Sequence, residues 1–176
     1  MKYFTPELLE RVSSPDDDVA DAADRDWERA IRAYNRRWRR IQAAFPRTVQ
    51  RFDQDHICLH DALVLSLGRQ NNTFVFVLQM EPPSQKLVIL TFALNGEPEI
   101  DTTAFPSRDS SGVVAWLYEE WDLDRDKQRW FEVLLSNGWS VKLPFREFRY
   151  LIGEQLLHLS NGKAIPGPAF LRRSAG

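Results

Sequence analysis

The spacing of apolar residues changes near residue 57, and this change separates a helical part of the chain from a sheet-forming part. Before it, apolar side chains recur three and four positions apart, a period that places them along one side of an α-helix. The stripe consists of Trp27, Ile31, Tyr34, Trp38, Ile41 and Phe45. We predict one long amphipathic helix over residues 16–45, which Pro46 ends because proline cannot continue a helix.

A shorter helix is predicted ahead of the long one. Thr5 is a good capping residue, Pro6 suits the first helical position, and Glu7 places a favourable negative charge in the first turn. The two helices form a predicted N-terminal helical arm, residues 1–46. Residues 47–176 form a predicted sheet region, and both parts belong to one compact domain because a chain of this length suits a single core.

Three runs with the alternating period of β-strands follow the arm, at residues 57–67, 73–80 and 86–94. The connections between them are short, which favours antiparallel neighbours. The second and third runs are apolar on both faces. We therefore expect them at the centre of a sheet, with other parts of the protein covering each face.

The next segments predict a loop, a strand and a hairpin. Residues 95–112 are rich in glycine, proline and polar residues and indicate a loop, and residues 113–123 indicate another strand. Asn137-Gly138 lies between two apolar runs and predicts a β-hairpin with a type I′ turn, because that turn needs positive φ at both positions.

The last predicted element is a short helix over residues 145–157, followed by an irregular tail. It rests on Phe145, Phe148 and either Leu151 or Ile152, whose spacing of three or four places them on one side of a helix. The predicted fold is therefore α+β, with N-terminal helices packed on a mostly antiparallel sheet of about six strands and a short helix near the C-terminus.

Composition limits the possible functions. The formal net charge is −2, so no overall positive field attracts nucleic acid or membranes. A single Cys excludes an internal disulfide and suits a reducing compartment. The N-terminal residues lack the continuous apolar segment of a signal peptide, and no run approaches the roughly 18 apolar residues of a membrane span. We expect a soluble, cytoplasmic protein without a membrane partner.

The run HICLHDALV, residues 56–64, concentrates the candidate chemistry. On a strand, His56, Cys58 and His60 project from one face. The outer two are then about 13 Å apart, too far for one metal ion with ligand bonds of about 2.0–2.3 Å, so we predict no metal site. Asp61 falls among leucines on the other face, where a buried carboxylate needs partners. His60 and Asp61 are therefore candidates either for local hydrogen bonding or for acid–base chemistry in a cleft.

No complete motif for catalysis or cofactor binding is present. The chain lacks G-x-S-x-G, G-x-x-x-x-G-K-[ST] and G-x-G-x-x-G, the motifs of serine hydrolases and of common nucleotide-binding loops. Asp122, Asp124 and Asp126 have the spacing of a calcium-binding loop. Lys127, however, stands where that loop needs Gly, and Val133 where it needs Glu. We predict no cofactor and favour a protein that is not an enzyme.

The predicted long helix carries a group of arginines, Arg36, Arg37, Arg39 and Arg40, that could bind a partner through phosphate groups. The nearest aromatic residues belong to the apolar stripe and are expected to pack inward. The acidic residues of the 16–28 segment also offset the positive charge. A solvated helix face is the ordinary interpretation of such a group, and nucleic acid is the less favoured partner.

Three segments together resemble an uncharacterised family of bacterial proteins: MKYFTPELL at the start, LHDALV in the first predicted strand, and FEVLLSNGWSVKLPFREF near the end. The resemblance spans residues 1 to about 150 and implies an α+β fold with no established activity. The family's His-Asp pair corresponds to His60 and Asp61, with no assigned role. Strands of the LHDA type also resemble those of small bacterial immunity proteins that neutralise toxins, although fold alone does not give function.

Three functions remain open. The favoured one is a non-enzymatic protein-binding module that binds another protein or itself, and a toxin-neutralising immunity-type protein is one form of it. The second is a small-ligand binder or an enzyme that uses Asp61 and His60. The third is a nucleic-acid binder that uses the arginine face of the helix over residues 16–45.

Overall fold

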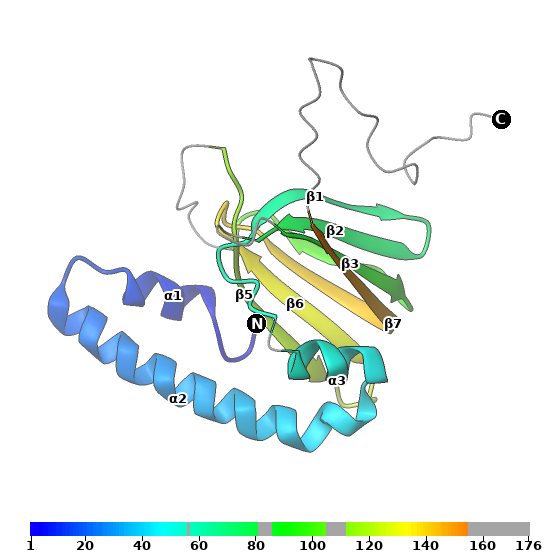
Figure 1. Ribbon diagram of the computed structural model, residues 1–176. Helices are drawn as coiled ribbons and strands as arrows, with labels where there is room; N and C mark the ends of the chain where they lie inside the picture. The colour runs from blue at the N-terminus through cyan, green and yellow to red at the C-terminus, as the bar shows by residue number, and fades with distance from the viewer. Residues whose placement is uncertain (56, 81–85, 105–111, 155–176) are drawn as a thin grey trace, which may run out of the picture.

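The computed structural model describes residues 1–55, 57–80, 86–104 and 112–154. Within these ranges it contains three α-helices and a seven-stranded sheet (Figure 1). The helices are α1 (Pro6–Val12), α2 (Asp17–Ile41) and α3 (Arg47–Gln54), with a 3₁₀ turn over Gln42–Ala44. The strands are β1 (Leu63–Gln70), β2 (Thr73–Gln79), β3 (Lys86–Leu94), β4 (Glu99–Asp101), β5 (Trp116–Leu123), β6 (Arg129–Leu135) and β7 (Ser140–Glu154).

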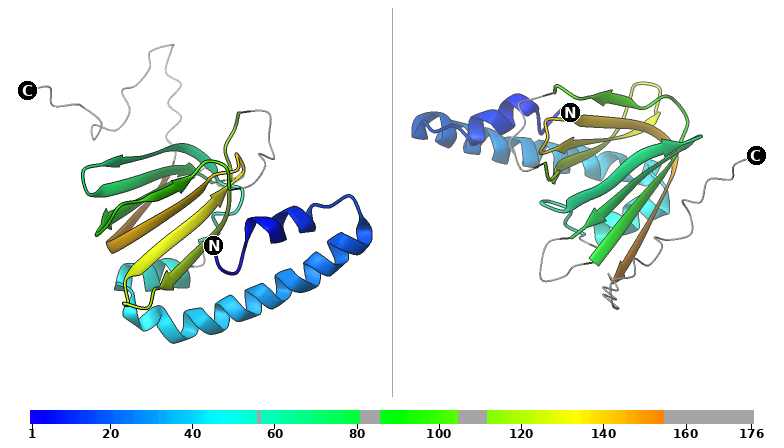
Figure 2. Two further views of the ribbon diagram at one scale, coloured as in Figure 1. Left: turned by 180° about the vertical axis from the view of Figure 1, so that it is seen from behind. Right: turned by 90° about the horizontal axis from the view of Figure 1, so that it is seen from above.

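The predicted α+β architecture is confirmed. The strand order is β1-β2-β3-β7-β6-β5, with β4 paired to β7, and every strand pairing is antiparallel. The long strand β7 joins the two halves of the sheet, because its first residues pair with β4 and β6 while the rest pair with β3. Figure 2 shows α1 and α2 running antiparallel beside the β5 edge, away from β1 and β2.

The N-terminal helices begin where the sequence predicts. The hydroxyl of Thr5 accepts a hydrogen bond from the Leu8 amide at 3.3 Å, and Asp16 caps α2 in the same way. The end of the arm differs from the prediction, because α2 stops at Ile41 and Pro46 precedes a further helix, α3. Only two turns long, α3 offers little periodicity, yet it buries Val49 and Phe52 against the sheet.

The predicted C-terminal helix is wrong over residues 145–154, which form part of β7, while residues 155–157 lie outside the described residues. The cause is a β-bulge. Ala93 on β3 pairs with Glu147 on β7, but the next residue, Leu94, pairs with Phe145. The pairing therefore skips Arg146, which is the extra residue of the bulge. The bulge turns Phe145 and Phe148 to the same buried face at a spacing of three, which imitates a helical period.

Two smaller predictions also need correction. The hairpin between β6 and β7 is confirmed, but its turn is not type I′, because Gly138 has positive φ (87°) and Asn137 does not. The Gly138 amide donates to the Leu135 carbonyl at 3.0 Å, as in a longer hairpin loop that needs only one left-handed residue. The predicted loop at residues 95–112 contains the short strand β4.

The core lies on the inner face of the curled sheet and is dominated by aromatic rings. Phe92 on β3 contacts the rings of Phe131, Phe148 and Trp121, at centroid distances of 4.8, 5.0 and 5.9 Å. α3 closes this side through Phe52, whose ring lies 5.4 Å from that of Phe148. The core thus anchors β5 and α3, the elements that carry the groups considered next.

Candidate functional site

His60 and Asp61 do not lie on a strand. They form a turn ahead of β1, in which Asp61 has a φ of 65° and the Ala62 amide donates to the Leu59 carbonyl at 2.9 Å. The expected strand over residues 57–67 therefore begins only at Leu63. The expected position of Asp61 on a buried leucine face is wrong, because the Asp61 side chain is 48% exposed.

The two candidate residues contact each other. Nδ1 of His60 lies 2.7 Å from Oδ2 of Asp61, and the His60 ring packs edge-on against Tyr118 at 4.9 Å. The left-handed backbone explains the aspartate, since Asp tolerates that conformation better than most residues. His56, which the sequence pattern groups with Cys58 and His60, lies outside the described residues.

A pocket of about 290 Å³ lies beside this turn, between α2, α3 and β5. Its lining combines aromatic, acidic and thiol side chains. These residues are Tyr34, Phe52, Asp53, Ile57, Cys58, Glu119 and Trp121. The HICLHD run thus reaches a concave site after all, but it contributes Ile57 and Cys58 to the lining and not the predicted pair.

Glu119 lines this pocket with a carboxyl group whose pKa is raised. Burial raises its pKa, while a hydrogen bond from the Trp116 indole and the charge of His60 act in the opposite direction. The indole Nε1 of Trp116 donates to Oε2 of Glu119 at 2.7 Å. Trp116 is itself fully buried in the core, so it fixes the carboxyl group in place.

Tyr34 forms the wall of the pocket on α2. Its hydroxyl accepts a hydrogen bond from the Trp121 amide at 2.9 Å and so ties the helix to strand β5. Burial raises the pKa of Tyr34 strongly, and the nearby carboxylates, Glu119 first among them, raise it further. The phenol therefore stays neutral and serves as a hydrogen-bonding group.

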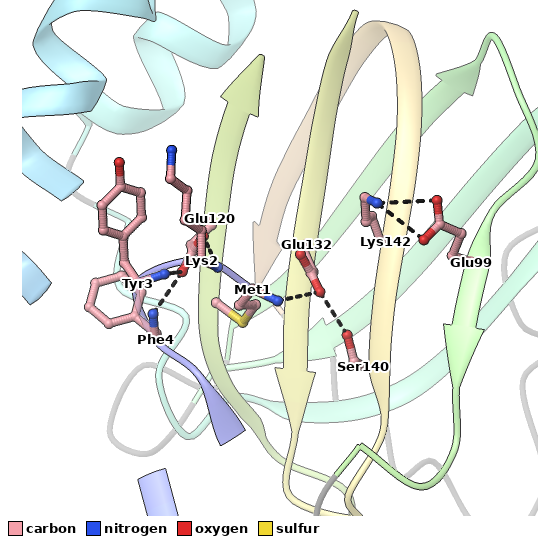
Figure 3. A network of polar contacts seen from close by, with 9 residues as sticks. All are labelled: Met1, Lys2, Tyr3, Phe4, Glu99, Glu120, Glu132, Ser140 and Lys142. Carbon is pink, nitrogen blue, oxygen red and sulfur yellow. Dashed lines mark hydrogen bonds and ion pairs between the residues drawn. The ribbon is translucent and has the colours of Figure 1, made fainter. Parts of the chain in front are cut away.

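On the opposite face of the sheet, two buried carboxylates on the neighbouring strands β5 and β6 hold the N-terminal segment (Figure 3). Glu120 accepts hydrogen bonds from the amides of Lys2, Tyr3 and Phe4, at 2.9, 2.7 and 2.7 Å. Glu132 on β6 accepts a hydrogen bond from the Met1 ammonium group at 2.6 Å. We call this arrangement the N-terminal clamp.

The clamp adjoins a wider hollow of about 600 Å³ that reaches β4. Lys142 on its wall is paired with Glu99 at 3.1 Å, and Ser140 donates to Glu132 at 3.1 Å. Its polar groups are thus largely satisfied by neighbouring protein groups, which identifies a structural role for them.

The four candidate arginines near the end of α2 separate into two groups. Arg37 binds the buried Asp122 on β5 at 2.7 Å and the Leu123 carbonyl at 3.1 Å, so its guanidinium links α2 to the sheet. The other three, Arg36, Arg39 and Arg40, are exposed.

The outer face of the sheet carries an apolar surface. Val77, Ile89 and Leu151 are cross-strand neighbours on β2, β3 and β7, and Leu151 is 64% exposed. Around this row lie further apolar residues, and we call the whole set the outer sheet face. It comprises Val75, Val77, Leu87, Ile89 and Leu151, together with the exposed Leu65 at the register shift of β1.

Two expectations concerned β2 and β3: that they lie at the centre of the sheet, and that both of their faces are covered. β2 and β3 are central strands, as their sequences predict. Their outer residues, however, belong to neither hydrophobic cluster of the described structure, so within these ranges only the inner face is buried in the core.

Sequence reasoning missed the glutamates of β5 and β6. The signal was present in LYEEWDL, where two adjacent glutamates interrupt a strand. Adjacent strand residues point to opposite faces, so Glu119 faces the pocket and Glu120 the N-terminal clamp. The partner of each glutamate lies far away in the sequence and could not be named from it.

Within the described ranges, no cluster of three or more His, Cys, Asp or Glu side chains could hold a metal ion. None of the described helices combines the length and the apolar character of a membrane-spanning segment. Comparisons of the chain with protein-family models, with curated proteins and with solved structures found no match. The resemblance to a bacterial family stays a prediction.

Proposed function

We propose that this protein is a non-enzymatic protein-binding module, that it binds through the outer sheet face, and that a second copy of the chain occupies this face. The observation that supports the proposal is the row Val77, Ile89 and Leu151. A solvated face of an antiparallel sheet normally carries polar residues, whereas here three strands in succession present aliphatic ones.

A second copy suits this surface because a two-fold interface brings each patch against itself. A charged patch would then be repelled by the same charge on the other copy. The centre of the outer sheet face is uncharged, so no such repulsion arises there. Two sheets can pack face to face at a separation of about 10 Å, with their side chains interdigitated. Charged residues stand at the rim of the surface, where Arg149 pairs with Glu147 at 3.6 Å.

The size of the surface indicates a weak dimer. Four strands spaced about 4.8 Å apart, with about five residues of 3.3 Å each, cover a planar area of roughly 300 Å². Stable interfaces bury about 800 Å² per partner, so we expect monomer and dimer to exchange at roughly tens to hundreds of micromolar.

Sedimentation equilibrium of the full chain tests the proposal. Leu151→Lys places a charge within the expected contact, at the β7 end of the aliphatic row, and should shift the protein to monomer. Because Leu151 is 64% exposed, the substitution should not change the fold. Ile100→Lys is the matched control, because Ile100 is 47% exposed on β4, away from the outer sheet face. A wild-type protein that stays monomeric at several hundred micromolar would contradict the proposal, as would equal effects of the two variants.

A further inference from the structure

The pocket between α2, α3 and β5 joins three aromatic side chains to two carboxyl groups. Tyr34, Phe52 and Trp121 form apolar walls, and Asp53 and Glu119 supply acidic groups. No lysine or arginine side chain is among the described residues that line it. A site of this composition has no positive charge of its own to balance the two acids.

Both carboxyl groups retain free hydrogen-bonding capacity. Oε2 of Glu119 accepts from Trp116 at 2.7 Å, and Oδ2 of Asp53 accepts from the Trp38 indole at 2.9 Å. The second oxygen of each group accepts no hydrogen bond from the described residues. Glu119 is half-buried and Asp53 is exposed, so the free oxygen of Glu119 is only partly hydrated and would gain from a hydrogen-bond donor bound in the pocket.

The electrostatics of the neighbouring phenol support this view. Apart from burial, the charges of Glu119, Glu120 and Asp53 all raise the pKa of Tyr34, so their negative potential converges on the pocket wall. An aromatic ring attracts a cation to its face, and this attraction adds to that of the carboxylates.

We propose that this pocket binds a small organic cation, namely a primary ammonium compound with a short apolar chain. The ammonium group of the ligand donates hydrogen bonds to the free oxygens of Glu119 and Asp53, and the alkyl chain of the ligand packs among the rings of Phe52 and Trp121. A volume of about 290 Å³ is at the lower limit of ligand pockets, so the ligand has only a few heavy atoms.

Binding of such a cation releases a proton over a defined pH range. Burial raises the pKa of Glu119, and a bound ammonium stabilises the ionised carboxylate and lowers that pKa again. Affinity should therefore increase as the pH rises through the pKa of Glu119 in the free protein. The other titratable groups at the site are Tyr34, Asp53 and Cys58, with His60 next to Glu119.

The test uses n-butylammonium as the probe and the full chain labelled with ¹⁵N. The indole N–H of Trp116 donates directly to Glu119, so its NMR signal reports on that carboxyl group. Butyrate and 1-butanol have the same chain length and serve as the anionic and neutral controls. Glu119→Gln and Asp53→Asn keep an acceptor for Trp116 and Trp38 and should stay folded, and Glu147→Gln is a matched variant on the exposed surface.

We expect n-butylammonium to shift the Trp116 signal saturably, with affinity at least tenfold weaker in Glu119→Gln and unchanged in Glu147→Gln. The Asp53→Asn variant should also bind more weakly. The proposal is overturned if n-butylammonium causes no saturable shift, or if 1-butanol binds as tightly, because the pocket would then be a merely apolar hollow. It is equally overturned if the affinity of Glu119→Gln matches that of the unaltered chain.

Discussion

Removal of the Glu120 carboxylate should detach the N-terminal segment and destabilise the whole fold. Glu120 is fully buried on β5 and accepts three backbone amides, of Lys2, Tyr3 and Phe4. Phe4 is also buried, and its ring lies 5.1 Å from that of Trp27 on α2. The carboxylate therefore connects the sheet, the N-terminal segment and the helical arm.

The magnitude follows from the number of hydrogen bonds. A hydrogen bond to a charged group contributes about 1.5–3 kcal/mol, so three give an upper bound of about 4.5–9 kcal/mol. The bonds share one carboxylate and are not additive, and Glu120→Gln keeps an oxygen that can still accept from Tyr3 and Phe4. Its amide group, however, would face the Lys2 amide, donor against donor. We expect Glu120→Gln to cost about 2–3 kcal/mol and Glu120→Ala about 4 kcal/mol.

Urea unfolding followed by circular dichroism measures this cost. With a slope of about 2 kcal/mol per molar, Glu120→Gln should lower the midpoint by roughly 1 M. Glu147→Gln is the control, because that side chain is 59% exposed and its ion pair within the described part of the chain is the one with Arg149 at 3.6 Å, so its effect should stay within about 0.5 kcal/mol. Equal midpoints for the two variants would refute the role assigned to the N-terminal clamp.

Two further predictions concern the other carboxylates of β5. Because burial raises the pKa of Glu119, the stability linked to its protonation is present at acidic pH and is lost as the pH rises through the raised pKa. Glu119→Gln should match the unaltered protein near pH 4 and be more stable than it at pH 8, and parallel pH profiles of the melting temperature would count against this. Arg37→Gln should cost about 2–3 kcal/mol in urea unfolding because it removes the guanidinium 2.7 Å from the buried Asp122 and leaves that carboxylate only the more distant Lys2 ammonium, at 3.9 Å, among the described cations. The exposed Arg36→Gln should change stability by less than about 0.5 kcal/mol. Similar costs for these two arginine variants would contradict the pairing.

The sequence predicts elements well where one period persists over many residues. The stripe from Trp27 to Phe45 indicated α2, and the alternating apolar runs indicated β2 and β3. Prediction failed where a local irregularity changes the period. The bulge at Arg146 made strand residues resemble a helix, and the left-handed backbone at Asp61 ended a run that looked like a strand.

The candidate site was predictable only in part. The HICLHDALV run did indicate a segment with chemical groups near a pocket, but the carboxyl group that matters there, Glu119, belongs to β5. Its environment comes from Trp116 in the core and from Tyr34 on α2. Such a convergence depends on how the strand packs against distant elements, which no local pattern in the sequence encodes.

The outer sheet face is the central claim about function, and methyl NMR over a dilution series tests it most directly. Spectra of the full chain from about 20 to 500 µM span the range in which a weak dimer should dissociate. We predict that concentration-dependent shifts are confined to the methyl groups of the outer sheet face, with Val77, Ile89 and Leu151 the most affected. Shifts absent over this range, or centred on methyl groups elsewhere such as Ile31 on α2 or Ile100 on β4, would contradict the account.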